Sequence, residues 1–180
     1  MEEVQKFPAK NGEEVTLRTA VPDDAGAILK TIKSTSPERS YVLMEQYGKN
    51  DESEREYILG MDPEENLLLV AEMSGEVVGS LAALQADEGQ NPQTGHILRV
   101  GLHLAQTYRG LGIGSRMLRY TSEWAKEHGF KKLEASIFTT NKRSLHLFDR
   151  AGFQEEGTRR KRFWVGNDYI DEVLMGKILE

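Results

Sequence analysis

Three glycines stand at alternate positions in residues 108–115, after an apolar run and directly before a helical pattern. The first N–H groups of a helix have no partner within the helix, and the helix dipole adds partial positive charge there. Glycines at such a point let the backbone adopt positive φ and approach a ligand closely. The stretch is therefore predicted to cradle a phosphate group, helped by Arg109 and the Ser115 hydroxyl. A tight turn without a ligand is the alternative.

The residue order in this stretch argues against two common nucleotide-binding loops. A Walker A loop ends in Gly-Lys-Ser or Gly-Lys-Thr, whereas this one ends in Gly114, Ser115 and Arg116. A dinucleotide-binding loop has the pattern G-x-G-x-x-G, whereas this one has G-x-G-x-G. Glu134 stands where a ribose-binding acid would be expected, but the preceding elements do not alternate as a doubly wound sheet requires. Both nucleotide folds are therefore disfavoured.

Apolar periodicity predicts the elements that position this loop. Strands are expected over residues 14–20, 66–73, 76–84, 96–104 and 132–138, with two more after Phe153 that break near residues 166–168. Helices are expected to open at Pro22, to cover residues 51–59, to end at Gly129 and to cover residues 140–151. The order β-α-α-β-β-β-α-β-α-β-β predicts an α/β fold of α+β character. Its mixed, mostly antiparallel sheet would have seven strands flanked by about four helices.

The pattern around the glycines continues along the chain and resembles a known family. Residues 109–114 resemble the R/Q-x-x-G-x-G/A motif of the GNAT acetyltransferases. A second family pattern, N-x-x-A/S-x-x-L-Y-x-x-x-G-F, resembles the spacing of Asn141, Ser144, Leu147, Gly152 and Phe153. Residues 156–175 resemble the C-terminal hairpin of one bacterial subgroup. The resemblance covers roughly residues 14–178 and is strongest from residue 96 onward.

The resemblance implies an acyltransferase that moves an acetyl group from acetyl-CoA, its cosubstrate, to a primary amine by direct attack. The strand that ends at Leu104 would separate from its neighbour at a bulge. Backbone groups of Leu102, His103 and Leu104 would pair with the pantetheine arm, and one N–H would polarise the thioester carbonyl. The pyrophosphate would be held by Arg109, Gly110, Leu111, Gly112, Ile113, Gly114 and Ser115.

Three residues of the next helical pattern also belong to the implied cofactor site: Asn141, Ser144 and Phe148. For Asn141, a helix N-cap is the alternative role, because Asn favours that position. Phe148 stands where many relatives carry a Tyr whose hydroxyl protonates the leaving thiolate. Either another group acts as the acid, or solvent protonates the thiolate, since a thiol of pKa near ~8.5 is a tolerable leaving group.

The reaction also needs a base or a water chain, because only a neutral amine can attack. The candidates for this base are Glu72, His96, His103 and Glu134. Each has a structural alternative, which is solvation at a strand end for the carboxylates and a hydrogen-bonded framework role for the histidines. The sequence does not choose among them.

Charge is unevenly distributed over the 180 residues, whose net charge is −6. Residues 1–95 carry a net charge of −11, and residues 96–180 carry +5. The basic half would then hold an anionic ligand, and the acidic half, especially residues 34–65, would favour cationic amines as acceptors. Alternatively, the uneven distribution of charge serves only solubility.

The chain has no cysteine, which excludes a disulfide, a zinc-thiolate site and a thiol nucleophile. No metal is predicted.

The sequence also bears on the binding partners and the cellular location of the protein. Arg159, Arg160, Lys161 and Arg162 precede two aromatic residues, but the acidity of the chain and strand alternation disfavour nucleic acid. No apolar run is long enough for a membrane span, and the start lacks a signal-peptide pattern. We therefore expect one cytoplasmic domain over residues 1–180, with a small-molecule or peptide amine as acceptor. A homodimer through the C-terminal strands is possible.

Two other functions fit the same motifs. Phe148 is compatible with a non-catalytic acyl-CoA-binding sensor on the same fold. An acyltransferase for longer acyl-CoA molecules would need a roomier pocket near Leu102 and Leu104. Turnover with any amine separates the sensor from the enzyme.

Overall fold

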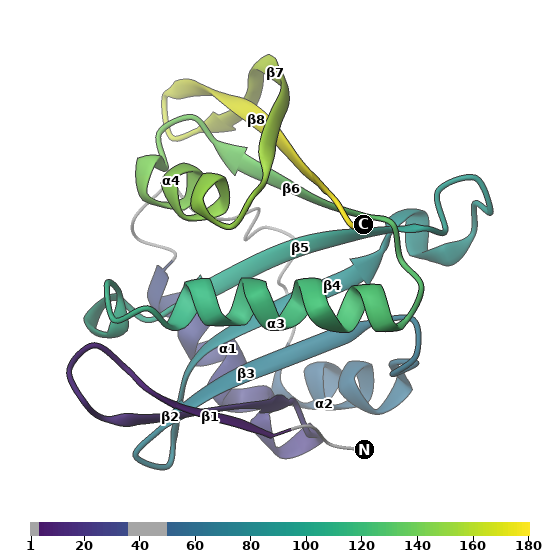
Figure 1. Cartoon of the computed structure of the whole chain (residues 1–180). Coiled ribbons are helices and arrows are strands. Elements are labelled where there is room, and N and C mark those ends of the chain that lie inside the picture. The colour runs from purple at the N-terminus through teal and green to yellow at the C-terminus, as the bar shows by residue number, and fades with distance from the viewer. Residues whose placement is uncertain (1–3, 36–49) are drawn as a thin grey trace.

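A computed structural model describes residues 4–35 and 50–180, which form one sheet of eight strands with helices on both faces (Figure 1). The strands are β1 (Gln5–Pro8), β2 (Glu14–Thr19), β3 (Leu67–Met73), β4 (Glu76–Gln85), β5 (Ile97–Leu104), β6 (Lys132–Phe138), β7 (Gln154–Val165) and β8 (Asp168–Ile178). The α-helices are α1 (Ala25–Thr35), α2 (Asp51–Gly60), α3 (Ile113–Glu127) and α4 (Lys142–Arg150), and short 3-10 turns are η1 (Pro22–Asp24), η4 (Ala86–Gly89) and η5 (Gln106–Tyr108).

The mixed, mostly antiparallel sheet confirms the predicted fold class, but the predicted number of strands was one too low. The additional strand, β1, has four residues and ends in Pro8. Such a short segment, in a polar N-terminal stretch, gives no visible alternation. Pro8 is tolerated because β1 is an edge strand that pairs only with β2 among the described strands.

The strand order is β1-β2-β3-β4-β5-β6-β8-β7, and every neighbouring pair is antiparallel except β5 and β6. These two parallel strands pair over three residue pairs only, from Ile97 with Lys132 to Arg99 with Glu134. Beyond that point they separate, and β5 runs on to Leu104 while β6 runs on to Phe138 (Figure 1). The sheet is therefore two antiparallel halves joined at one short parallel seam.

The expected bulge in the strand that ends at Leu104 is not where the separation arises. The register of β4 with β5 is continuous from Gly79 opposite Leu104 to Gln85 opposite Leu98. The register shift in this half lies instead between β3 and β4, at Ala71 and Glu72. β6 stays paired with β8 along its whole length while it separates from β5.

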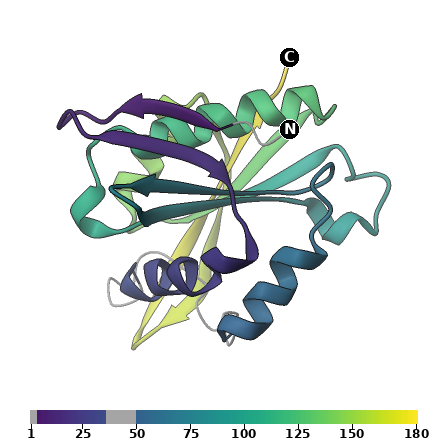
Figure 2. The ribbon, with the colours of Figure 1, turned by 90° about the horizontal axis from the view of Figure 1, so that it is seen from below.

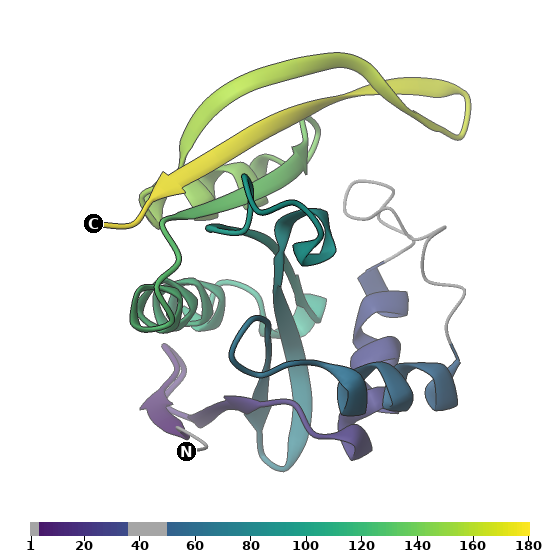
Figure 3. The same ribbon diagram turned by 90° about the vertical axis from the view of Figure 1, so that its right-hand side faces the viewer.

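Helices α3 and α4 cover one face of the sheet, and α1 and α2 cover the other face of its first half (Figures 2 and 3). The larger core cluster lies under α3 and α4, and the smaller one lies under α1. In β3, Leu67 and Leu69 belong to the first cluster while Leu68 and Val70 belong to the second. A strand buried on both faces reads as a continuous apolar run, which is why residues 66–73 do not alternate.

The predicted helices are confirmed, and side chains explain several of their ends. Asn50 caps α2, since its side chain accepts a hydrogen bond from the Ser53 N–H while the Ser53 hydroxyl accepts one from the Asn50 N–H. Gly129, at φ +83°, follows α3. The last predicted helix begins at Lys142 rather than at residue 140, because Asn141 is its cap. In the described ranges, no helix has the length and apolar content to cross a membrane.

Candidate functional site

The predicted phosphate cradle is an open helix N-terminus. Gly110 and Gly112 have φ of +79° and +88°, in the left-handed region that glycine tolerates best. Gly112 is the N-cap of α3, and no side chain in the described part of the chain caps this helix. The N–H groups of its first turn are therefore available to an anion. The loop is fixed from both sides, because the Lys10 N–H donates to the Leu111 carbonyl at 3.1 Å and Arg109 Nε donates to the Leu104 carbonyl at 3.0 Å.

The third glycine of the motif has a different function from the first two. Gly114 is helical and buried, and a β-carbon there would lie 3.0 Å from Leu147 Cδ2 and 3.3 Å from Leu102 Cδ2. Its absence of a side chain lets α3 pack closely on β5 and α4. Ile113, fully buried beside it, anchors the same turn in the core, whereas Ser115 is exposed at the rim.

Sequence reasoning missed Lys10, which lies in the turn between β1 and β2. A β-carbon on Gly112 would be 4.0 Å from Lys10 Cε, so this lysine stands directly beside the cradle. The turn could not be placed there from sequence because β1 was not predicted.

The end of β5 combines backbone and side-chain features that the predicted cofactor site needs. Past Arg99, the edge of β5 that faces β6 has no partner strand in the described structure. Leu102 and Leu104 pack against the core under α3, and His103 points to the opposite face by strand alternation. Burial lowers the pKa of His103 to about 4, so its imidazole is neutral at neutral pH.

Two other base candidates, His96 and Glu134, lie beside the paired part of β5 and β6. His96 is exposed at the far end of β5, where its carbonyl accepts the N–H groups of Lys131 and Lys132. Glu134 is opposite Arg99 in the last residue pair before β5 and β6 separate, and it forms an ion pair of 3.0 Å with Lys132. Hydrogen bonds from Lys132 to Glu156 and then to Glu134 raise the pKa of that lysine.

Glu72 belongs to a charge network on the α1 side of the sheet. Arg18 Nη2 lies 3.1 Å from Glu72 Oε2, and the same guanidinium forms two hydrogen bonds, of 2.7 and 2.9 Å, with Asp24. The bonds to Asp24, followed by those to Glu72, raise the pKa of Arg18. Burial works to raise the pKa of Asp24, but the hydrogen bonds from Arg18 and the Val21 N–H outweigh it and leave that pKa lowered. The network ties β2, β3 and η1 together.

The structure gives Asn141 and Phe148 clear packing functions. Asn141 is buried, and its side-chain oxygen accepts the Ser144 N–H at 3.0 Å, which caps α4. Phe148 is 2% exposed and packs edge-on against Phe153, with ring centroids 4.9 Å apart. The cofactor contacts of these two residues stay predictions.

A buried carboxylate on β8 was not recognised from the sequence. The side chain of Glu172 is 6% exposed and accepts a hydrogen bond from the Ser136 hydroxyl. Arg159 Nη1 lies 3.1 Å from Glu172 Oε2, and Arg162 Nε lies 3.6 Å from it. The signal in the sequence was a Glu directly before the apolar residues Val173 and Leu174 of a predicted strand, but its neighbour Asp171 makes the position look like part of a solvated turn.

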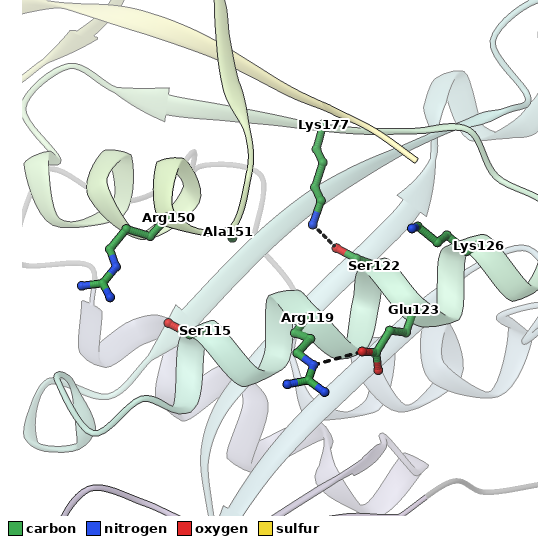
Figure 4. Close-up of a pocket in the computed structure, with 8 residues that line it drawn as sticks. All are labelled: Ser115, Arg119, Ser122, Glu123, Lys126, Arg150, Ala151 and Lys177. Carbon is green, nitrogen blue, oxygen red and sulfur yellow. Dashed lines mark hydrogen bonds and ion pairs between the residues drawn. The ribbon is translucent and has the colours of Figure 1, made fainter. Parts of the chain in front are cut away.

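A cationic pocket of about 390 Å³ runs along α3 toward α4 and β8 (Figure 4). Within it, Lys177 Nζ donates to the Ser122 hydroxyl at 3.0 Å, and Arg119 pairs with Glu123 at 3.0 Å. Burial, and then the nearby Lys126, lowers the pKa of Lys177. The lining residues are Ser115, Arg119, Ser122, Glu123, Lys126, Arg150, Ala151 and Lys177. Four cations face one carboxylate, and Ser115 joins this pocket to the cradle.

The chain is similar to known proteins over most of its length. Residues 33–153 match the model of the acetyltransferase (GNAT) family. The candidate phosphinothricin acetyltransferase YwnH of Bacillus subtilis (strain 168) is 31% identical over 143 residues, which are 79% of this chain and 86% of that one. The L-amino acid N-acetyltransferase AaaT of Escherichia coli (strain K12) is 26% identical over 114 residues, which are 61% of this chain and 67% of that one.

Solved structures agree on the fold. A GNAT superfamily phosphinothricin acetyltransferase from Sinorhizobium meliloti, in complex with acetyl-CoA, superposes with a TM-score of 0.82 at 20% identity, covering 92% of this chain and 88% of that one. The family match spans the cradle, the seam and Phe153. The chain therefore belongs to the GNAT family of acetyltransferases and is an acetyl-CoA-dependent N-acetyltransferase.

Proposed function

We propose that the enzyme transfers the acetyl group directly from acetyl-CoA to a primary amine while both substrates are bound. The observation that carries this proposal is the separation of β5 from β6 beyond Arg99 and Glu134. It leaves a strand edge unpaired beside the cradle, and Arg109 connects the two by its hydrogen bond to the Leu104 carbonyl. A pantetheine arm can pair with that edge while the pyrophosphate occupies the helix N-terminus.

In this arrangement the backbone supplies most of the cofactor contacts. Leu102, His103 and Leu104 would pair with the pantetheine, and one of their N–H groups would stabilise charge on the thioester oxygen. The first turn of α3, from Ile113 to Ser115, would bind the pyrophosphate with Lys10 alongside.

The cationic pocket fits the other end of acetyl-CoA, which carries a ribose 3′-phosphate. Arg119, Arg150 and Lys177 line this pocket, and it continues from the cradle through Ser115. Phosphate is recognised well by guanidinium groups, and an added anion would offset the mutual repulsion of Lys126 and Lys177. Acetyl-CoA should therefore bind more tightly than its 3′-dephospho form, and Arg150→Gln should reduce that difference.

The proposed transfer forms one C–N bond, breaks one C–S bond and moves one proton from the amine. The neutral amine nitrogen attacks the thioester carbon, the C–S bond breaks, and the CoA thiolate leaves. His103 lies on β5 past the point where β5 and β6 separate, and as a neutral imidazole it can accept the amine proton and pass it to water. With Phe148 in place of an acid, the thiolate would take its proton from solvent.

The first test is calorimetry of acetyl-CoA with the wild type, Gly112→Trp and Gly129→Trp. Both glycines have positive φ, +88° and +83°, but only Gly112 belongs to the cradle. We expect binding by the wild type and Gly129→Trp and its loss in Gly112→Trp, with thermal melts confirming that each variant is folded. Equal binding by both variants would contradict the cradle assignment.

Thiol release from acetyl-CoA in the presence of an amine panel separates the enzyme from the sensor. Turnover with at least one amine supports the proposal. Acetyl-CoA binding without turnover on any amine would favour the acyl-CoA sensor instead.

A further inference from the structure

The Glu172 cluster lies at the open end of the seam, on the face away from α3. Phe138, the last residue of β6, is opposite Glu172 in the register with β8. If the parallel register of β5 and β6 continued past Arg99, His103 would stand beside Phe138. The two strands separate there instead, so His103 and Glu172 occupy opposite sides of the opening.

Strand alternation places both side chains toward the same face. On β8, Val173 and Met175 pack in the core under α3 and α4, so Glu172 points the other way. On β5, Leu102 and Leu104 likewise pack in that core and His103 points away from it. The far end of the β7–β8 hairpin reaches over this side of the sheet, where α1 lies (Figure 3). In the proposed reaction the acceptor would approach from this face, because the cradle at the start of α3 lies on the other one.

Two guanidinium groups converge on one buried carboxylate in this cluster. Arg159 contacts Glu172 through Nη1 and Arg162 through Nε. The two arginine side chains are 55% and 54% exposed, whereas Glu172 is 6% exposed. Since Ser136 also donates to Glu172, the carboxylate is well satisfied, and the cluster retains a net positive charge at its exposed side. The 3.6 Å contact of Arg162 with Glu172 is an ion pair through Nε, and within residues 4–35 and 50–180 its two Nη atoms make no hydrogen bond, so they can donate to another anion.

An irregularity of β7 brings both arginines to the same face. In a regular strand, residues three apart point to opposite faces. Here the register shifts between Arg159 and Phe163, so that three residues of β7 face one residue of β8. Lys161, in the middle, has φ +49°, and its N–H donates to Asp171 Oδ1 at 2.6 Å. Such backbone strain persists only where the surroundings enforce it, and it is common at ligand sites.

We propose that Arg159 and Arg162 bind an acidic group of the acceptor, so that the substrate is a small amine that carries a carboxylate, such as a free amino acid. Glu172 and Ser136 act as positioning residues that hold the two guanidinium groups. This inference rests on the proposed function. It differs from the sequence-based expectation of a cationic acceptor, which rested on the acidic first half of the chain, especially residues 34–65. Residues 36–49 of that half lie outside the described structure.

The test compares acceptors that differ only in the acid group: an L-amino acid, its amide and its decarboxylated amine. The enzyme variants are Arg162→Gln and Arg162→Lys, with Arg160→Gln as the matched control, since Arg160 is exposed in the same irregular stretch. For the wild type, we expect the highest kcat/KM with the amino acid. Arg162→Gln should lower that value by about tenfold or more, mainly through KM, because it removes a charge-assisted contact.

Several readouts keep this inference separate from the proposed function. Arg162→Lys should recover part of the loss, Arg160→Gln should cause none, and acetyl-CoA affinity by calorimetry should be the same in all variants. If the amide or the decarboxylated amine is used as well as the amino acid, or if Arg162→Gln affects all acceptors equally, the acid-group assignment is wrong while acetyl transfer stands. If acetyl-CoA binds but no amine is acetylated, both proposals fail.

Discussion

Gly114 on α3 lies against Leu102 on β5, so closely that a β-carbon on Gly114 would come within 3.3 Å of Leu102 Cδ2. The glycines of the cradle therefore have two distinct physical roles. Gly110 and Gly112 provide positive φ, whereas Gly114 provides space between α3, β5 and α4. The residue that completes the cofactor motif is also the point where the helix N-terminus is held against the strand edge.

Replacement of Gly114 tests this packing role. Alanine is a better helix former than glycine by about 1 kcal/mol, but its methyl group would crowd Leu147 Cδ2 at 3.0 Å. We expect Gly114→Ala to be less favourable in the wild type than in a Leu147→Ala background, with a coupling energy of about 0.5 kcal/mol or more. Urea denaturation of the four proteins measures it. Strict additivity would show that the close approach does not limit the packing of α3.

His103 gives the fold a pH dependence whose sign can be worked out. Burial lowers its pKa from 6.5 to about 4, so between these values the unfolded chain binds a proton that the folded chain does not. Stability that is present above pH 6.5 is therefore lost as the pH falls toward 4, by up to about 3 kcal/mol. In His103→Gln this part of the pH dependence should be absent. Denaturation at a series of pH values checks it, and an NMR titration of the ring near its ordinary pKa would contradict it.

Arg18 is predicted to be structural. Arg18→Met leaves the nearly buried carboxylate of Asp24 without its ion pair, at a loss of about 3 kcal/mol in the free energy of unfolding at neutral pH. Because the folded pKa of Asp24 is lowered, the stabilisation by this pair is present above its ordinary pKa of 3.8 and is lost as the pH falls through the folded value.

The loss of stability of Arg18→Met relative to the wild type should therefore be smaller in acid, as denaturant titrations at neutral and acidic pH would show.

Glu72→Gln tests the other carboxylate of the same network. Since Glu72 pairs with Arg18 rather than facing the seam, we expect this variant to change stability while the pH profile of turnover stays the same. Loss of the acidic limb of that profile, where a general base becomes protonated, would indicate instead that Glu72 is the base.

Much of the fold followed from patterns that are local in sequence. The apolar run of β3, the glycines before α3 and the cap at Asn141 are each decided within a few residues, and those glycines alone predicted the cradle. The seam could be anticipated only through the family resemblance, and its cause was wrongly assigned to a bulge in β5. The separation depends on how β6 pairs with β5 on one edge and with β8 on the other, and these strands are far apart in the chain.

The Glu172 cluster escaped sequence reasoning for a related physical reason. A register shift breaks the two-residue alternation on which strand reading depends, so Arg159 and Arg162 were assigned to opposite faces. Nothing local distinguishes such a basic run from a solvated strand edge. Only the pairing with β8, through Asp171 and Glu172, shows that both arginines meet one carboxylate.

The backbone of Lys161 offers a direct test of that irregular stretch. Its φ of +49° is unfavourable for any residue with a β-carbon, by roughly 1–2 kcal/mol. Lys161→Gly and Lys161→Ala remove the same long side chain but differ in this penalty, so the glycine variant should be the more stable by about 1 kcal/mol. Arg160, which has no positive φ, is the control, and there alanine should be more stable than glycine. Urea denaturation of the four variants measures both differences. The same sign at both positions would show that β7 does not adopt this conformation at Lys161, and Arg162 would then not be directed to Glu172.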